Sequence, residues 1–363
     1  MDNQRFPVVN ENVDFGVPFL PFPEEEAEVG EAWLVRIIWI IIYSIVTAAI
    51  WLFAYALYLR YANRSSVGYC NSKETVNGKT ILITSKATGI GLEAARDLAR
   101  RGARVILACG EIKEAQKMAA SINSLETDGV ILVRKLNTAS LREVRNFAAD
   151  FLKTERRLDV LILAASLGGS DTKIMTDEGL ELTMATNHFG HFVLVNLLIG
   201  MLKSSSPSRV VVLASSAHSL LTSINPKDLN FKTIPYGGLK AYAQSMACNL
   251  LMANNLAHLL EGSGVIVNSM CPGMIKNQPY ITGNGLVAKI YQIFLNVATR
   301  TTEEGAQTLI HLAVSEEVAN HTGAFYIDCK ERSMTNLGRN GGLAKKLWER
   351  CEEVVGFIHK NDE

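Results

Sequence analysis

The sequence predicts an α/β domain built on a doubly wound, parallel, seven-stranded sheet, with an N-terminal transmembrane helix. Three observations predict this architecture. Short apolar segments alternate with helical stretches from residue 79 onward, a pair of glycines follows the first apolar segment, and residues 37–59 contain no charged side chain. Strands that are apolar along their whole length are covered on both faces, as in a parallel sheet between two layers of helices.

Seven segments carry the strand signal, each a short apolar run separated from the next by a helical stretch. Between the first two runs, residues 91–101 have the spacing of an amphipathic helix. We find no internal repeat and no low-complexity segment. The predicted strands are residues 79–84, 103–108, 130–133, 158–164, 209–214, 264–268 and 323–328.

The uncharged segment has the length of a membrane span. As a helix, residues 37–59 would extend about 34 Å at about 1.5 Å per residue, which exceeds a hydrocarbon core of about 30 Å. A buried core helix is the alternative, but this segment is apolar all round and precedes the domain. We therefore expect an acidic, disordered tail over residues 1–32, a transmembrane anchor over 33–60 and a linker over 61–75.

The charges around the span predict its orientation. Arg60, Arg64 and Lys73 follow it, whereas only Arg5 and Arg36 precede it. The positive-inside rule then places the large C-terminal part in the cytosol. We expect a single-pass protein of the endoplasmic reticulum or another organelle membrane.

Overall charge and cysteine spacing exclude two classes of function. The chain has 36 Lys and Arg residues against 36 Asp and Glu residues, so nothing favours nucleic acid as a partner. Its six cysteines are scattered, without Cys-x-x-Cys pairs or histidines at zinc-binding spacing. No metal site is predicted, and the thiols are expected to be reduced.

The glycine pair lies in the turn between the first predicted strand and the first helix. In a strand–turn–helix unit, a dinucleotide diphosphate meets the helix N-terminus at this position, and glycines let the backbone approach it. The residues expected to meet the diphosphate are Thr84, Ser85, Thr88, Gly89, Ile90 and Gly91.

Several ordered segments together resemble the short-chain dehydrogenase/reductase family, and within it the retinol dehydrogenase-like branch. They are residues 88–91, 99–105, 187–192, 209–218, 271–273, 304–308 and 328–330. The resemblance covers residues 76–357 and implies a Rossmann-type domain over 76–335, followed by a C-terminal helix and tail over 336–363. It also implies a membrane-bound protein that handles lipophilic alcohols or aldehydes.

The resemblance implies a catalytic set with one member replaced. In the family a tyrosine acts as acid and base, a serine holds the carbonyl oxygen, and an asparagine supports a proton relay. A lysine four residues after the tyrosine holds the nicotinamide ribose and lowers the tyrosine pKa. Here Tyr242, Ser215 and Asn187 match the first three, and Met246 occupies the lysine position.

The resemblance also implies NADP or NAD as cofactor, but the matching positions depart from the family pattern. The first glycine of the turn is Ser85, the usual arginine after the second strand is Gly110, and the aspartate after the third is Asn137. The Asn-Asn-Ala-Gly segment is replaced by residues 163–166. Beyond the turn, the positions implied to bind cofactor are Glu111, Asn137, Ala164, Pro272 and Gly273.

A second Tyr-x-x-x-Lys pattern lies just upstream. Tyr236 and Lys240 match it, but counting back without a gap from residues 262–265 puts the family tyrosine at Tyr242. Lys240, two residues before Tyr242, points away from the face of the helix that Tyr242 occupies. We therefore assign Tyr242 and Met246 to the catalytic positions.

Methionine at this position is expected to weaken acid–base catalysis. Bringing a tyrosine from a pKa near 10 to neutrality takes about 3 pKa units, or roughly 4 kcal/mol. Met246 supplies no charge to lower this pKa, and losing that effect would cost on the order of a thousandfold in rate.

Two hypotheses follow from these departures. The first is a membrane-anchored pseudoenzyme that binds a lipophilic ligand, a nucleotide or a protein partner. The second is an active NAD(P)-dependent oxidoreductase acting on retinoid, steroid or other lipid alcohols and carbonyls. Residues 279–297 would close a lipophilic pocket, touch the bilayer or lie in a homo-oligomer interface, and the sequence leaves these open.

Overall fold

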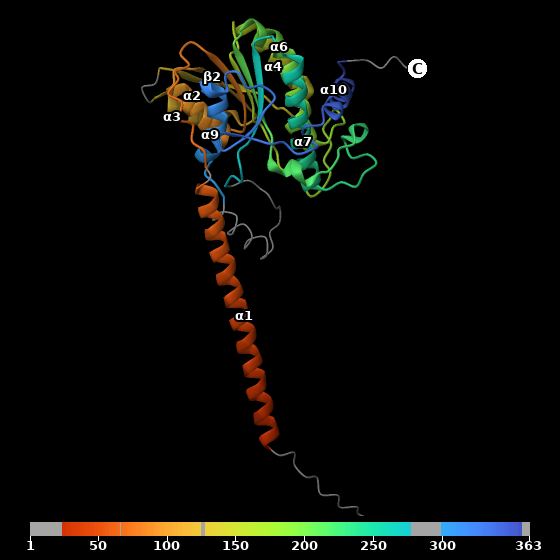
Figure 1. Ribbon diagram of the computed structural model, residues 1–363. Coiled ribbons are helices and arrows are strands. Elements are labelled where there is room, and N and C mark those ends of the chain that lie inside the picture. Colours follow the sequence, from red (N-terminus) through yellow and green to blue (C-terminus); the bar gives the residue numbers. More distant parts are fainter. Residues whose placement is uncertain (1–23, 66, 125–127, 277–298, 358–363) are drawn as a thin grey trace, which may run out of the picture. The chain divides into compact units, whose positions relative to one another are not determined.

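The computed structural model describes residues 24–65, 67–124, 128–276 and 299–357 (Figure 1). Residues 1–23 of the tail predicted over 1–32, and the whole of the segment 279–297, lie outside the described residues. The strands are β1 Thr80–Thr84, β2 Arg104–Cys109, β3 Val130–Lys135, β4 Val160–Leu163, β5 Ser208–Leu213, β6 Val265–Cys271, β7 Phe325–Ile327 and β8 Lys330–Arg332. The longer helices are α1 Glu24–Ser65, α2 Ile90–Arg100, α3 Ile112–Asn123, α4 Leu141–Thr154, α6 Gly190–Ser204, α7 Gly238–Leu259, α9 Thr302–Val314 and α10 Gly341–Val355.

Short helical turns complete the described chain. They are α5 Leu182–Met184, the π-helical turn η1 Ala185–Phe189, and the 3-10 turns η2 Ser216–Leu220, η3 Pro226–Asp228 and η4 Glu316–Val318.

The strands form one sheet in the order β3-β2-β1-β4-β5-β6-β7-β8. The first seven strands in this order are parallel, as the apolar runs predicted, and β8 pairs antiparallel with β7. Strand order reverses between β1 and β4. In open α/β sheets, ligands bind outside the carboxyl ends of the strands at such a reversal, so this edge holds the candidate site.

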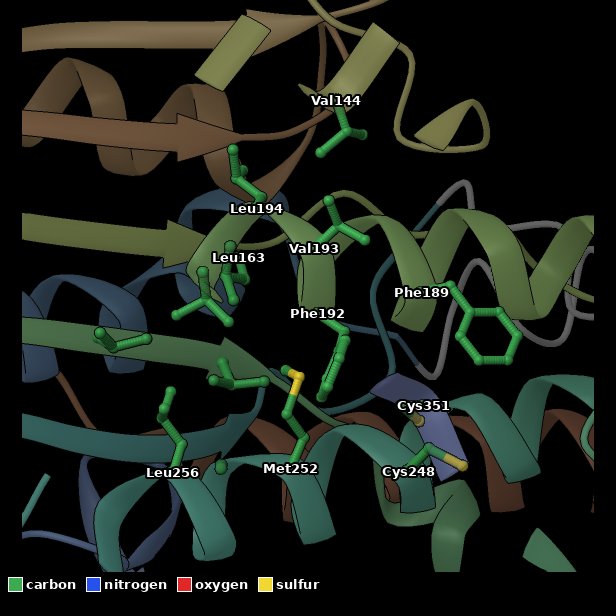
Figure 2. Packing of buried hydrophobic residues seen from close by; sticks show 14 of the residues in the cluster. Val144, Leu163, Phe189, Phe192, Val193, Leu194, Cys248, Met252, Leu256 and Cys351 are labelled. Carbon is green, nitrogen blue, oxygen red and sulfur yellow. The ribbon is translucent and has the colours of Figure 1, made fainter. Parts of the chain in front are cut away.

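Helices cover both faces of the sheet. In Figure 1, α2, α3 and α9 lie on one side, and α4, α6, α7 and α10 on the other. Each side encloses its own cluster of buried side chains. Figure 2 shows part of the larger cluster, where Phe192 of α6, Met252 of α7 and Cys351 of α10 meet beside the sheet. The C-terminal helix, predicted as a separate segment from residue 336, is therefore part of this core.

Helix α1 is longer than the predicted anchor at both ends. It begins at Glu24, so residues 24–32, predicted to be disordered, are helical, and it runs to Ser65 into the predicted linker. Glu and Ala are good helix formers, and acidic side chains favour a helix N-terminus, which accounts for the earlier start. Within α1, Trp33–Ala62 is a candidate membrane span with exposed apolar side chains. The other stretch of sufficient length and apolarity, Leu182–Ser204, is mostly buried in the domain.

Candidate active site

Thr84, the last residue of β1, joins three elements at the reversal of strand order. Its fully buried hydroxyl accepts from the backbone N of Ala164 (3.1 Å) and of Ala165 (3.4 Å), and lies 2.8 Å from Nε2 of His191. Nδ1 of His191 is 2.9 Å from the carbonyl oxygen of Asn187. Because a carbonyl only accepts, Nδ1 carries the proton and Nε2 accepts from Thr84. Burial lowers the pKa of His191 to about 4, which keeps the ring neutral.

The glycine turn after β1 leaves room for an anion. Gly89 has a φ of 102°, which favours glycine, and a Cβ built there would meet no atom within 4 Å. Helix α2 begins at Ile90 without a side chain capping its first turn, so its N–H groups can serve a phosphate. Ser85 is buried, and a Cβ added to Gly91 would lie 2.1 Å from its Oγ. The side chain of Ser85 is therefore turned toward Gly91, and Thr88 is exposed.

The predicted adenosine-side positions lie at the ends of the next two strands. Gly110, directly after β2, has open space where a side chain would stand, and Glu111 is exposed beside it. Asn137, after β3, is exposed, and its Oδ1 accepts from the backbone N of Ala139 at 3.1 Å. This turn needs only an acceptor oxygen, so asparagine preserves the local backbone.

A buried ion pair supports the loop after β6. Arg300 and Asp328 form a salt bridge with both side chains more than nine-tenths buried. A Cβ on Gly273 would lie 2.9 Å from Nη1 of Arg300, and the φ of Gly273 is 77°. Pro272 and Gly273, the predicted cofactor positions, are thus held against a rigid charged pair.

Tyr242 lies among hydroxyl and thiol groups. Burial raises the pKa of Tyr242, the side chains of Ser215 and Ser166 lower it by hydrogen bonding, and Cys271 raises it. No cation stands among these causes in the described residues. Met246, one helical turn further along α7, is fully buried. The structure therefore brings Ser215 and Tyr242 together and places an apolar side chain at the position of the family lysine.

Asn187 braces the segment after β4. It is fully buried in the π-helical turn η1, and its amide both accepts from the N of Leu167 (2.7 Å) and donates to the O of Leu167 (2.9 Å). Its Nδ2 also donates to Oγ of Ser245 at 2.9 Å, and that hydroxyl donates to the carbonyl of Tyr242 at 2.8 Å. Asn187 thus links the floor of the site to the helix that carries Tyr242.

A second buried network extends from η1 to the C-terminal helix. Nδ2 of Asn249 donates to the carbonyls of Asn187 (3.0 Å) and Leu213 (2.9 Å), so its Oδ1 accepts from Nδ1 of His188 at 3.0 Å. Nε2 of His188 is then the acceptor for the thiol of Cys351 at 3.2 Å. Burial lowers the pKa of His188 to about 4 and raises that of Cys351, so this pair is neutral.

Comparison with known proteins assigns the fold to a family. Residues 79–281 match the family model for short chain dehydrogenases. Mouse retinol dehydrogenase 14 is 37% identical over 296 residues, which cover 78% of this chain and 87% of that protein. Human retinol dehydrogenase 13 is 34% identical over 80% of this chain and 88% of its own. The chain belongs to the short-chain dehydrogenase family. Within it, the chain is retinol dehydrogenase-like.

Solved structures of other proteins agree with the fold. The crystal structure of an uncharacterised protein from Mycobacterium paratuberculosis matches with a TM-score of 0.64 and 27% identity, over 80% of this chain and 98% of that one. L-Sorbose reductase from Gluconobacter frateurii, solved with NADPH and L-sorbose, matches over 70% of this chain and 96% of that one, with a TM-score of 0.56 and 18% identity. The second likeness supports the fold alone.

The residues of this chain fit a nicotinamide nucleotide in part. The open space above Gly89 and the uncapped start of α2 suit the diphosphate. The side chain of Ser85 does not obstruct it, because it faces Gly91. At the nicotinamide end, Met246 offers no hydrogen-bond donor for a ribose hydroxyl. Among the described residues, no group of three potential ligands could hold a metal ion.

The upstream Tyr-x-x-x-Lys pattern does not form a dyad. The hydroxyl of Tyr236 donates to Oε1 of Glu181 at 3.2 Å, and burial together with that carboxylate raises the pKa of Tyr236. Lys240 is exposed in the first turn of α7. Tyr236 is therefore a structural link from the start of α7 to α5.

Sequence reasoning missed Ser245, Asn249 and Cys351 as supports of the site. Ser245 and Asn249 are polar, lie four residues apart on α7 and are almost fully buried. Their spacing could have indicated this role, because two polar residues four apart share one face of a helix that is otherwise mostly apolar. Cys351 carried no such signal, since only tertiary structure brings α10 to His188.

Proposed function

We propose that this chain is a membrane-anchored, retinol dehydrogenase-like protein whose site binds ligands but supports hydride transfer poorly. It would act by binding a lipophilic molecule, with a nicotinamide nucleotide held weakly at the diphosphate turn. The observation that carries the proposal is the environment of Tyr242. The side chain of Tyr242 is half-buried, burial raises the pKa of its hydroxyl, and the residue one turn further along the helix is Met246.

The step that this site supports poorly is proton transfer by Tyr242. A tyrosine that exchanges a proton with substrate near pH 7 needs a pKa close to that pH. Hydrogen bonds from Ser215 and Ser166 favour the ionised form of Tyr242, but burial is the larger influence and opposes them. With no cation in reach among the described groups, Tyr242 stays protonated at neutral pH.

A slow oxidoreductase is the second candidate, favoured by what the site retains. Ser215 remains beside Tyr242, and Asn187 holds the segment after β4. A carbonyl oxygen could still accept hydrogen bonds from the two hydroxyls. When bound, NADPH or NADH would supply hydride. The relatives named retinol dehydrogenases make a retinoid alcohol or aldehyde the first ligand to try.

The membrane setting supports a lipophilic ligand. Trp33–Ala62 is long and apolar enough to cross a bilayer, and its side chains are exposed. We propose a single-pass anchor in an organelle membrane with the domain in the cytosol, because Arg60, Arg64 and Lys73 follow the uncharged segment 37–59.

The test is nucleotide and retinoid binding by the full-length chain in lipid nanodiscs. Thermal stabilisation and nicotinamide fluorescence would be followed during titration with NADPH and NADH, and stabilisation alone with retinaldehyde. A ligand at a hundredfold excess over its Kd adds about 2.7 kcal/mol to the unfolding free energy. We expect stabilisation by retinaldehyde at micromolar concentration and by nucleotide only at millimolar concentration.

The matched control is Gly89→Val, which places a side chain where the diphosphate would lie. Because valine is strained at a φ of 102°, the thermal unfolding of this variant without ligand must first match that of the parent. The variant should remove the response to nucleotide and leave the response to retinaldehyde. Micromolar nucleotide binding, together with NADPH oxidation and retinol formation when retinaldehyde is then added as hydride acceptor, would overturn the proposal in favour of the slow oxidoreductase. Failure of both ligands to stabilise the chain would exclude both candidates.

A further inference from the structure

Three large apolar side chains are exposed at the edge of the sheet that carries the site. Leu220 at the end of η2 is 62% exposed, Leu239 in the first turn of α7 is 64% exposed, and Met274 after β6 is 44% exposed. Single exposed leucines are ordinary in soluble domains. Three exposed apolar side chains at one edge of the sheet, next to the candidate site, are less ordinary and suggest a surface that contacts an apolar partner.

These side chains lie at a common edge because of the sheet topology. Leu220 ends η2, which follows β5, Leu239 lies in the first turn of α7, and Met274 follows β6. Strands β5 and β6 are parallel neighbours, so their carboxyl ends meet at one edge. Two hydrogen bonds tie the segments together there: the backbone N of Ser216 donates to Sγ of Cys271 at 3.3 Å, and the hydroxyl of Ser216 is hydrogen-bonded to the same sulfur at 3.3 Å.

The same segments are positively charged. Over residues 214–240 and 271–276 the charged side chains are four lysines and one aspartate. All four lysines are exposed, whereas Asp228 is buried and accepts from three backbone N–H groups and one hydroxyl. Residues 165–173 of the loop after β4, where Gly169 approaches Gly238, add Asp171 and Lys173, which cancel. Arg300, whose backbone pairs with Met274 and Lys276, is neutralised by Asp328 and is followed by Glu303 and Glu304, so four lysines face two carboxylates and the balance is positive. We define the basic apolar rim as Leu220, Lys232, Leu239, Lys240, Met274 and Lys276.

We propose that the basic apolar rim docks on the surface of an anionic lipid bilayer. Apolar side chains between lysines are the composition of surfaces that lie in the membrane interface, where the side chains enter the headgroup boundary and the lysines meet anionic lipids. The segment between α1 and β1 is held against the domain, because Sγ of Cys329 donates to the carbonyl of Gly68 at 3.4 Å and the backbone N of Cys70 donates to Oε1 of Gln307 at 3.1 Å. Only residues 66 and 67 therefore separate the end of α1 from the part of the chain that is fixed to the domain, and Cys329 follows β7, whose carboxyl end lies at the same edge of the sheet as those of β5 and β6. A domain tethered so closely to a bilayer needs only weak additional affinity to dock.

Docking at this edge has a consequence for the site. The rim lies at the carboxyl ends of β5 and β6, and Ser215 and Tyr242 belong to the same β5–α7 region. A lipophilic ligand could then pass from the bilayer to Tyr242 without crossing water. This consequence rests on the proposed function, whereas the docking itself does not depend on what the site binds.

Hydrogen–deuterium exchange of the full-length chain in nanodiscs tests the proposal. Discs of phosphatidylcholine alone would be compared with discs containing 30% phosphatidylserine. We expect slower amide exchange over residues 219–241 in the anionic discs. Each lysine near an anionic surface contributes about 1 kcal/mol, or about fivefold, so removing three lowers the docking equilibrium about a hundredfold. The variant Lys232→Gln/Lys240→Gln/Lys276→Gln should therefore lose the protection.

Matched controls lie at the opposite end of the strands. Lys203, exposed in the last turn of α6, and Leu259, 54% exposed at the end of α7, resemble the rim in exposure but not in position. The variant Lys203→Gln/Leu259→Ser should keep the protection. Equal exchange in both kinds of disc would overturn the proposal. Protection that instead rises with the number of chains per disc would assign the rim to a second copy of this chain, and would equally overturn it.

Discussion

Replacing Met246 by lysine should create carbonyl reduction in this chain. Residues four apart on a helix have Cβ atoms about 5–6 Å apart, so the new ammonium would lie close to Tyr242. At about 5 Å and an effective dielectric constant of about 20, the attraction to a tyrosinate is about 3 kcal/mol. That lowers the pKa of Tyr242 by about 2 units. We expect the rate of retinaldehyde reduction to rise about a hundredfold.

The assay follows retinol formation by chromatography, with the full-length chain in nanodiscs and saturating NADPH. Met246→Leu and Met246→Gln are the controls, and neither should raise the rate, because neither carries charge. Burying an unpaired ammonium costs several kcal/mol of stability, so thermal unfolding must first show that Met246→Lys is folded. A folded, nucleotide-bound Met246→Lys/Ser85→Gly variant with no gain over the parent would refute the reasoning.

The unmodified chain gives a second test of the same electrostatics. In retinol oxidation the tyrosine accepts a proton, so its ionised form is the active one. Burial raises the pKa of Tyr242 above its ordinary value near 10. Any residual oxidation should therefore rise about tenfold per pH unit up to at least pH 9.5. A plateau near pH 7 or 8 would mean that another group supplies the missing charge.

Three further predictions concern the supports of the site. Hydrogen bonds outweigh burial and hold the pKa of Asp228 well below its usual range. The stability lost in Asp228→Asn should therefore be constant above about pH 4 and shrink only as the pH falls further. Thermal unfolding scans at several pH values measure this loss. Asp328→Ala removes the carboxylate from a buried ion pair with Arg300, which should cost about 3–5 kcal/mol and lower the Tm by roughly 10 °C; no change would mean that the pair contributes nothing to stability. Gly91→Ala should cost about 1–3 kcal/mol in denaturant unfolding because its Cβ meets Ser85, and Ser85→Gly should restore the loss.

The parallel sheet could be predicted because its signal is local. Continuous apolar runs identified β1 to β7, and the glycine pair located the turn before α2. Strand β8 could not be predicted, since Lys330–Arg332 is three exposed, charged residues that pair only because the chain folds back on β7. The ends of α1 were missed because the prediction followed hydropathy, whereas good helix formers extend a helix beyond its apolar centre.

The site was predictable in its parts and not in its connections. The motif positions identified Ser215, Tyr242 and Met246, and the structure brings the first two together. The supports of Asn187 depend on tertiary contacts between η1 and α7 that no spacing in the sequence encodes. The sequence also could not predict the direction of the Ser85 side chain, because a serine at this position could face either Gly91 or the diphosphate.

The most direct test of the central claim compares the unmodified full-length chain with Tyr242→Phe. Both would be assayed in nanodiscs for retinaldehyde reduction with millimolar NADPH, and both must first give the same thermal unfolding and retinaldehyde stabilisation. Because Tyr242 lacks a cation, the two rates should agree within about tenfold. A parental rate a hundredfold or more above that of Tyr242→Phe would show that the tyrosine works as an acid without lysine, and would contradict the account.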